Sequence, residues 1–300
     1  MQNRMTIGFL TCPGTNPAST NRRSDAFEHD LQVAALRPEM EAAGMELREI
    51  EWRASDQSFD DIKLVLIGTA WDYQDHETEF LAKIDSLAER GITVCNSPEL
   101  VRWNSRKTYL RELAEANAAT IPTQWHERVT REDLSSAFTR FDTDRLVVKR
   151  QVGANAEGQH VFSAADTFPL NWSLEMPVMV QPFLPAIGET GEISFLFIDG
   201  QFCHAVIKRP ADGDYRVQSD YGGCEEAYDP PKGECASAKA IVDALPHGTP
   251  LYARIDMVRG NEGALLLMEA ELIEPFLYPK QGRELGRRMA AGIVRRLADT

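Results

Sequence analysis

Hydrophobic and polar positions at the start of the chain predict strands and helices in turn. Short apolar or alternating runs of strand length lie at residues 6–11, 45–50, 64–69 and 92–95. A helical segment ends near Gly44, and a second, amphipathic helix is predicted over residues 77–90. Because strands that alternate with helices form parallel sheets, residues 1–100 are predicted to fold as a small open α/β domain.

The rest of the chain predicts antiparallel strands joined by tight turns. Asp199-Gly200 and the segment from Arg259 to Gly263 contain the residues that hairpin turns prefer. A helix is predicted to open at Asn104 or Ser105, and an amphipathic helix that serves packing is predicted over residues 282–299. Further strands are predicted at residues 146–150, 178–185, 191–198, 201–208, 251–258 and 264–275.

Three carboxylates stand out on the last of these hairpins. Side chains alternate along a strand, so Glu269 and Glu271 project from one face, and pairing across the hairpin brings Asp256 beside them. Clustered acids repel one another unless a cation lies between them, and their hard oxygen ligands favour Mg²⁺ carried with a nucleotide's phosphates. The alternative is that Glu269 and Glu271 line the solvent face of an edge strand.

Composition and charge exclude several classes of protein. With 300 residues, 43% of them hydrophobic, the chain has the material for one large core or two to three smaller ones. Its five cysteines lack metal-binding spacing, which favours reduced thiols, and no apolar run is typical of a signal peptide or a membrane span. The net charge of −14, without any basic block, argues against nucleic acid and membrane surfaces as partners. We expect a cytoplasmic protein.

Two lysines lie where an anion would be expected. Lys107 falls in the first turn of the helix predicted to open at Asn104 or Ser105, where the helix dipole disfavours a cation and favours a bound anion; an exposed lysine is the alternative. Lys149 ends an apolar strand and precedes a loop of small residues from Gly153 to Gly158, whose backbone N–H groups are able to approach phosphate closely.

A second group of polar residues follows the strand at 64–69. Trp71, Asp72 and Tyr73 mix aromatic and polar groups at the carboxyl end of a strand, which is typical of the edge of a ligand pocket. We assign Asp72 to such a site and Asp75 to capping the next helix. The polar loop over residues 15–25, which leaves the first strand, is either a further ligand contact or an ordinary surface loop.

In this order, the motifs resemble the ATP-grasp ligases, and above all their glutathione-synthetase-like members. The resemblance covers nearly the whole chain and is carried by Val147-Val148-Lys149, by Gln181-Pro182-Phe183-Leu184 with Gly191-Glu192, and by Asp256 with Glu269 and Glu271. Within this family, Arg254-Ile255-Asp256 and the run from Glu269 to Pro275 are similar to the subgroup that contains the D-cycloserine-forming cyclo-ligase. The resemblance implies an ATP-grasp fold with domains at 1–100, 101–177 and 178–300.

The resemblance also implies which residues bind the nucleotide. Lys107 and Lys149 are then the phosphate lysines, and the loop with Gly153, Ala154 and Gly158 folds over the phosphates. The backbone of Gln181, Pro182 and Phe183 meets adenine. Glu192 holds the ribose hydroxyls, with Glu189 as its rival.

Metal and substrate positions are implied in the same way. Asp256, Glu269 and Glu271 match the Mg²⁺ ligands, for two ions that Mn²⁺ is able to replace, although family members often carry Asn where this chain has Glu271. Lys208 or Arg209 matches a basic residue on the phosphate side. Arg254 and Arg216 are candidates for contacting the reacting carboxylate or phosphate, with structural ion pairs as the alternative. Asp72, Tyr73 and Glu274 are the substrate-side candidates.

The implied reaction joins a small-molecule carboxylate to an amine. ATP phosphorylates the carboxylate, and the amine attacks the acylphosphate to give an amide, ADP and phosphate. Two alternatives stay open: ring closure within one substrate, as in the cyclo-ligase, and a nucleotide-binding regulator without turnover. The sequence defines no oligomeric state, although a homodimer is the common arrangement among soluble oligomers.

Overall fold

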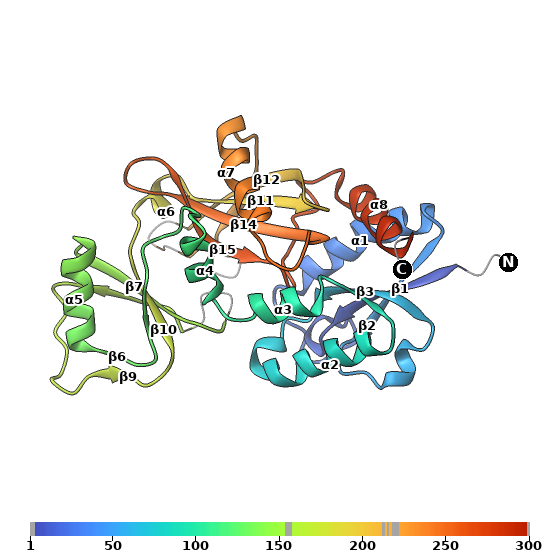
Figure 1. Ribbon diagram of the computed structural model, residues 1–300, viewed down its shortest axis with the longest axis horizontal. Coiled ribbons are helices and arrows are strands. Elements are labelled where there is room, and N and C mark those ends of the chain that lie inside the picture. The colour runs from blue at the N-terminus through green and yellow to red at the C-terminus, as the bar shows by residue number, and fades with distance from the viewer. Residues whose placement is uncertain (1–3, 154–157, 212–213, 215, 218–221, 299–300) are drawn as a thin grey trace.

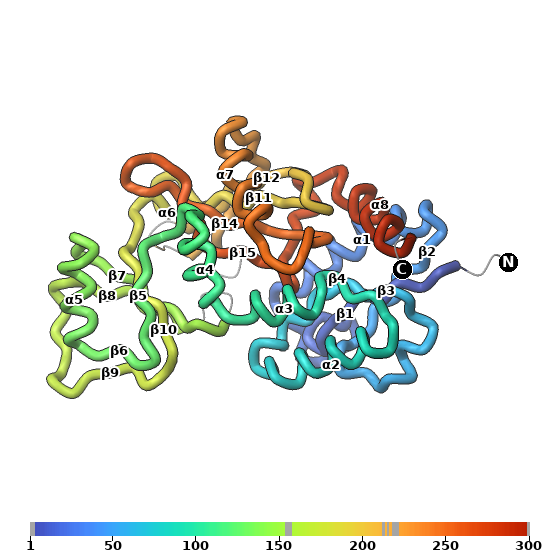
Figure 2. Tube along the Cα trace, viewed as in Figure 1, coloured from blue at the N-terminus to red at the C-terminus, as the bar shows by residue number. Residues whose placement is uncertain are grey.

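The computed structural model describes residues 4–153, 158–211, 214, 216–217 and 222–298. Within these residues the strands form three larger sheets and one two-stranded sheet (Figure 1). Figure 2 follows the chain from the N-terminal sheet, past α3 and α4, to a four-stranded antiparallel sheet at the opposite end of the molecule. A five-stranded sheet lies between these two ends, and the C-terminal helix returns to the N-terminal part.

The N-terminal sheet is parallel, as predicted, with the strand order β2-β1-β3-β4. Its strands are β1 (Met5–Thr11), β2 (Met45–Glu51), β3 (Ile62–Thr69) and β4 (Thr93–Cys95). The helices of this part are α1 (Ala26–Ala42), α2 (Glu77–Glu89) and α3 (Pro98–Asn104), with short 3-10 turns at Pro13–Thr15, Asp56–Phe59 and Tyr73–His76.

Both faces of this sheet are buried, which explains its apolar strands. On β3, Leu64 and Leu66 join a core with α1 and with α8 (Leu285–Ala298), whereas Val65 and Ile67 face α2 on the other side. Since successive side chains of a strand point to opposite faces, a strand covered on both faces has an unbroken apolar run.

The second sheet is antiparallel and has the order β5-β10-β7-β8. Its strands are β5 (Gln124–His126), β7 (Arg145–Arg150), β8 (His160–Ser163) and β10 (Val178–Pro182), and the small sheet pairs β6 (Val129–Thr130) with β9 (Ser173–Leu174). Helix α5 (Arg131–Phe141) packs on it, and its capping box of Thr130 and Asp133 is a start signal that the sequence analysis did not use. β10 pairs with β7, so this sheet continues past the domain limit predicted at residue 177, and the domain division stays a prediction.

The third sheet has the order β13-β12-β11-β14-β15 and contains both predicted hairpins. Asp199 and Gly200 both have positive φ in the first turn, as a tight two-residue hairpin requires. The strands are β11 (Glu192–Ile198), β12 (Gln201–Arg209), β13 (Cys224–Tyr228), β14 (Tyr252–Arg259) and β15 (Leu265–Glu271); the adjoining helices are α4 (Tyr109–Glu115), α6 (Ala186–Glu189) and α7 (Lys232–Asp243).

The two faces of the third sheet have different partners. Phe195 and Ile255 lie in the core that includes residues of α4 and α7, whereas Leu196 and Tyr252 point the other way, into the core of the N-terminal sheet. Alternation therefore places Ser194, Arg254 and Asp256 on the same face as Leu196 and Tyr252, one or two pleats further along. This stretch of the face carries the charged side chains.

The prediction that a helix opens at Asn104 or Ser105 is wrong. Asn104 is the last residue of α3, and its buried amide bonds the carbonyl of Ala270 and the N–H of Leu272 instead of capping a helix. The next helix begins at Tyr109, so Lys107 lies between two helices, where its N–H donates to the carbonyl of Gln151 at 2.8 Å. No helix of the described part of the chain is long and apolar enough to cross a membrane.

Candidate active site

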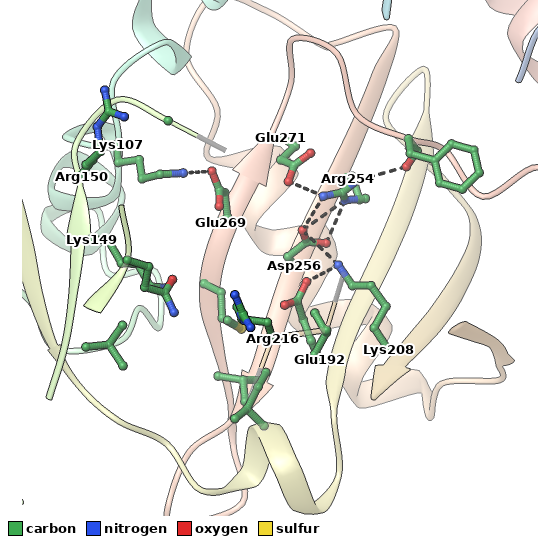
Figure 3. Close-up of a pocket in the computed structure, with 18 of the residues that line it drawn as sticks. Lys107, Lys149, Arg150, Glu192, Lys208, Arg216, Arg254, Asp256, Glu269 and Glu271 are labelled. Atoms are coloured by element: carbon green, nitrogen blue, oxygen red, sulfur yellow. Dashed lines mark hydrogen bonds and ion pairs between the residues drawn. The ribbon is translucent and has the colours of Figure 1, made fainter. Parts of the chain in front are cut away.

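A pocket of about 290 Å³ lies where the three sheets meet, and charged side chains enter it from several of them. In Figure 3, Lys107 and Lys149 approach from one side, and the charged face of the five-stranded sheet lies opposite. The register of β14 and β15 places Glu269 opposite Asp256 and Glu271 opposite Arg254. The prediction that the hairpin gathers these three carboxylates is confirmed.

Asp256 lies at the centre of a buried charge network. The Nε atom of Arg254 is 3.1 Å from both Asp256 carboxylate oxygens, its Nη2 donates at 3.0 Å, and Lys208 Nζ lies 3.6 Å away. The hydroxyl of Ser194 also donates to this carboxylate. Burial alone would raise the pKa of Asp256, but Arg254 and Lys208 outweigh it and lower the pKa to about 2. Asp256 is therefore ionised.

The two glutamates of β15 have different cations as partners. Glu271 accepts a hydrogen bond from Arg254, and Glu269 pairs with Lys107 across the pocket (Figure 3). Burial raises the pKa of Glu271 to about 8; the charge of Arg254 opposes this only in part, and Asp256 and Glu269 raise the pKa further. A further cation near Glu271 would relieve this repulsion.

Glu192 and Lys208 form a buried ion pair beside Asp256, and of the two pairs of rival residues these are the members that line the pocket. Lys208 lines the pocket, whereas Arg209 is outside it and binds Glu226 at 2.9 Å. Glu192 lines the pocket, whereas Glu189 is exposed and does not. Burial raises the pKa of Glu192, and burial would lower that of Lys208, but the charges of Asp256 and Glu192 hold the Lys208 pKa above its usual value.

The second sheet contributes the opposite wall. Lys149 of β7 lines the pocket with Gly153, and burial lowers the pKa of this lysine. Gly158 lies against the side chain of Arg150, and Ala154 is outside the described residues.

The hinge after β10 forms a separate part of this wall. Gln181, Pro182 and Phe183 line the pocket where β10 ends. The N–H of Phe183 donates to the carbonyl of Arg145 at 2.9 Å, so this N–H serves the strand pairing.

Two predicted substrate residues do not reach the pocket. Asp72 accepts hydrogen bonds from Trp52 Nε1 at 2.7 Å and from Arg53 at 2.9 Å, and Tyr73 is buried against Phe80. Placing them at the edge of the pocket was wrong, because the 3-10 turn that follows β3 directs their side chains toward the N-terminal core and the ion pair with Arg53.

Their neighbours line the pocket instead. Trp71 donates from Nε1 to the carbonyl of Glu274 at 3.2 Å, and Gln74 reaches the carboxylate of Glu274 at 3.4 Å. Glu274 was predicted and does line the pocket; burial raises its pKa to about 7. Asp75 lines the pocket too, and the N-cap of α2 is His76, so the capping role predicted for Asp75 is wrong.

Further residues that were not predicted individually from the sequence line the pocket. Arg23, Asp25 and Glu28 line the end of the pocket next to α1, and Tyr278 lines it beside Arg254. The first two belong to the polar loop at 15–25, whose position after β1 was the available signal. Arg216, which was predicted, also lines the pocket, and its Nη2 lies 2.8 Å from Asp214.

The donor chemistry of the acids suits Mg²⁺, although they are paired with cations of the protein. Among the residues that the structure describes, no group of three or more His, Cys, Asp or Glu is arranged to hold a metal ion. Asp256, Glu269 and Glu271 nevertheless supply carboxylate oxygens on one pocket face, and the raised pKa of Glu271 marks a place where another positive charge is favourable.

Comparisons with solved structures identify the fold. The crystal structure of D-cycloserine synthetase DcsG superposes with a TM-score of 0.80 at 22% identity, covering 97% of this chain and 99% of that one. D-alanine–D-alanine ligase from Bacillus anthracis, complexed with ATP, has a TM-score of 0.67 at 17% identity, covering 99% and 98%. The fold is the ATP-grasp fold, as predicted.

Sequence comparisons then identify the family. A family model described as the N-terminal domain of D-cycloserine synthetase DcsG matches residues 7–96. Cycloserine biosynthesis protein DcsG of Streptomyces lavendulae is 25% identical over 285 residues, covering 89% of this chain and 94% of that protein. Glutathione synthetase of Prochlorococcus marinus (strain MIT 9313) is 32% identical over 221 residues, covering 70% and 67%. This chain belongs to the ATP-grasp ligase superfamily, among its glutathione-synthetase-like members, and is an ADP-forming ligase of C–N bonds.

Proposed function

We propose that the pocket binds ATP with Mg²⁺ and joins the carboxylate of a small amino-acid-like substrate to an amine. The observation that carries this proposal is the convergence of two lysines, Lys107 and Lys149, on a pocket whose opposite wall holds Asp256, Glu269 and Glu271. The phosphates require the positive charges of the two lysines, and the metal ion requires the three carboxylates.

The nucleotide spans the groove between the second and third sheets. Adenine lies against Gln181, Pro182 and Phe183, and Glu192 accepts hydrogen bonds from the ribose. The phosphates lie between Lys107, Lys149 and Gly153, which all line one side of the pocket. The lowered pKa of Lys149 fits this assignment, because a buried ammonium gains most from an anionic partner.

Asp256, Glu269 and Glu271 would hold Mg²⁺, with two ions as the proposed number and Mn²⁺ as a substitute. The metal would neutralise the phosphate charge that develops during transfer. For this, Glu269 has to exchange Lys107 for the metal, and the released ammonium is then available to a phosphate oxygen. The lysine and the acid thus stabilise each other until the nucleotide arrives.

The reaction has two steps that need no nucleophile from the protein. An oxygen of the substrate carboxylate forms a bond to the γ-phosphorus while the bond to ADP breaks. The amine then attacks the acyl carbon, phosphate leaves with the bonding electron pair, and the amine loses a proton. Arg254, Lys208 and Arg216 line the pocket and stabilise the negative charge that moves through both steps.

The charge at the end of the pocket next to α1 supports an amino-acid-like substrate. There, Asp25, Glu28, Asp75 and Glu274 line the cavity together with Arg23, which pairs with Asp25 at 2.6 Å. Carboxylates favour a substrate ammonium, and the guanidinium favours a substrate carboxylate. This end also lies against the domain that matches the cycloserine synthetase model, so ring closure within one substrate is the second candidate.

The test is ADP release with Mg²⁺-ATP across amino acids, singly and in all pairs, with O-ureidoserine alone as the test for ring closure. ADP formation that requires one acid and one amine is the expected result, whereas formation with a single compound indicates cyclisation. Absence of ADP in every mixture, with tight ATP binding by calorimetry, would instead indicate a substrate outside the amino acids or a nucleotide-binding regulator. Lys149→Met is the negative control, since it removes a phosphate contact.

A further inference from the structure

The segment from Pro275 to Gly282, which connects β15 to α8, is held in place by three other elements; we call it the strap. Arg254 of β14 donates from Nη1 to the carbonyl of Phe276 at 3.2 Å. The next residue, Leu277, is held from two sides: its N–H donates to Gln32 of α1 at 2.9 Å, and its carbonyl accepts from His204 of β12 at 3.0 Å. The strap is thus fixed by the N-terminal helix and by two strands of the site.

The histidine contact is fixed in one protonation state. A carbonyl only accepts hydrogen bonds, so His204 Nε2 carries the hydrogen, and burial lowers the pKa of His204 to about 4, which keeps the ring neutral. Gly282 lies against the same ring: a Cβ at this position would lie 2.2 Å from His204 Cε1. Only glycine permits so close an approach.

Tyr278 occupies the middle of the strap in an unfavourable backbone conformation. Its φ is +47°, in the left-handed region that side chains other than Gly, Asn and Asp rarely adopt. Its carbonyl accepts from the N–H groups of Gln281 and Gly282, each at 3.1 Å. Strain of this kind persists only where the surroundings over-determine the position, and it occurs preferentially at functional sites.

The ring of Tyr278 lies beside two cations of the pocket. Its centroid is 5.7 Å from Arg254 Cζ and 5.9 Å from Lys208 Nζ, and the side chain is buried against Phe276 with a ring distance of 4.8 Å. The face of an aromatic ring carries partial negative charge and attracts a cation at such distances. The carboxylates of Asp256, Glu192 and Glu271 attract the same two cations from other directions.

We infer that Tyr278 is a positioning residue for the ligase reaction: its ring, held by the strap, keeps the guanidinium of Arg254 and the ammonium of Lys208 oriented at the pocket wall. This inference rests on the proposed function for the roles of Arg254 and Lys208. The phenol hydroxyl is not part of the inference, because the contact is made by the ring. An aromatic residue without a hydroxyl at position 278 is therefore expected to keep the two cations positioned, whereas an aliphatic residue is expected not to.

The first test is kinetic. Tyr278→Leu is expected to lower kcat about tenfold, since it removes two weak cation contacts, with the KM for ATP changed less than about twofold. Tyr278→Phe is expected to keep kcat within about twofold. Tyr228→Leu is the matched control: this tyrosine is on β13, does not line the pocket, and bonds Glu234. Tyr278→Asn, which suits a left-handed backbone, is a second variant without the ring if the leucine variant does not fold.

The second test does not need turnover. Ring-current shifts on the side-chain resonances of Arg254 and Lys208, assigned by substitution of each, are expected in the wild type and in Tyr278→Phe and absent in Tyr278→Leu. Equal loss of kcat in the Phe and Leu variants would overturn the inference, as would ring-current shifts that persist in Tyr278→Leu. If the wild type releases no ADP with any substrate, the proposed function fails, and the shifts alone decide whether Tyr278 positions the two cations.

Discussion

Glu269 lies directly opposite Asp256 in the register of β14 and β15, yet the two carboxylates pair with different cations. Asp256 is enclosed by Arg254 and Lys208 of its own sheet, whereas Glu269 reaches out to Lys107 between α3 and α4. Asp256 therefore belongs to the internal charge network of the sheet. Glu269 instead links the sheet to the preceding segment, and under the proposed function it exchanges Lys107 for the metal when the nucleotide binds.

Replacing Lys107 by alanine is expected to weaken ATP binding by about one to two orders of magnitude, since a charge-assisted contact to phosphate is lost. Isothermal titration calorimetry with a non-hydrolysable ATP analogue and Mg²⁺ measures this. Arg106→Ala is the matched control, because Arg106 is the exposed neighbour and pairs at the surface with Glu77 at 3.4 Å. Equal affinities for wild type and Lys107→Ala would exclude Lys107 from the phosphate site.

Glu269→Gln is expected to lower turnover at least about a hundredfold while the fold stays intact, because it removes a charged metal ligand without changing volume. ADP release at saturating Mg²⁺, together with the melting temperature, measures both properties. Glu262→Gln, in the exposed turn of the same hairpin, is the control and is expected to behave as wild type. Unchanged kinetics of Glu269→Gln would argue against the metal assignment.

Asp256→Asn is expected to act on stability as well as on activity. The aspartate is buried between Arg254 and Lys208, so its neutralisation removes one of the two carboxylates that each of these buried cations contacts, at a cost of about 3–5 kcal/mol. Calorimetry should show a melting temperature lower by about 10 °C. Asp243→Asn, which breaks only an exposed pair with Lys239, is expected to change it by no more than about 2 °C. A melting temperature equal to that of the wild type would contradict the buried network.

The ligand-free protein is expected to lose stability through Glu274 as the pH rises. Its pKa is about 7 in the folded protein and near the ordinary value of 4.5 when unfolded, so the folded state binds the extra proton between these pH values. The contribution of Glu274 to the free energy of unfolding is therefore greatest below about pH 4.5 and falls as the pH rises to about 7.

Thermal melts of the wild type and of Glu274→Gln across this range measure the effect. The glutamine variant, which cannot ionise, is expected to show a smaller decline in melting temperature with rising pH. Parallel curves for the two proteins would mean that burial does not raise this pKa.

Much of the strand framework could be predicted from local sequence. Alternation along β15 placed Glu269 and Glu271 on one face, but the turn alone does not bring Asp256 opposite them. A β-bulge between Asp256 and Met257 shifts the register by one residue, so that Asp256 lies opposite Glu269. The apolar run of β3 predicted a strand buried on both faces, and the structure confirms it. The strand predictions succeeded because the period of a strand depends on residues close together in the chain, whereas a bulge is not encoded by that period.

The positions of isolated side chains could not be predicted in this way. Asn104 has the residue type of a helix cap, but its amide forms hydrogen bonds with the backbone of Ala270 and Leu272, far along the chain. The helix therefore does not begin there, and Lys107 lies outside any helix. Asp72 and Trp71 are adjacent in sequence, yet one joins an ion pair with Arg53 and the other lines the pocket. Both residues lie between β3 and the 3-10 turn at Tyr73–His76, and the direction of a side chain there depends on what packs around it, which the local pattern does not encode.

The sequence by itself determined most of the longer strands, the parallel order of the N-terminal domain, the acidic hairpin and the resemblance to a ligase family. Only the tertiary structure decided which cation each acid meets, that Lys208 rather than Arg209 lines the pocket, and that Tyr278 lies beside Arg254. Strand patterning is set by interactions between near neighbours, whereas ion pairs and ring contacts form between residues that only packing of the three sheets brings together.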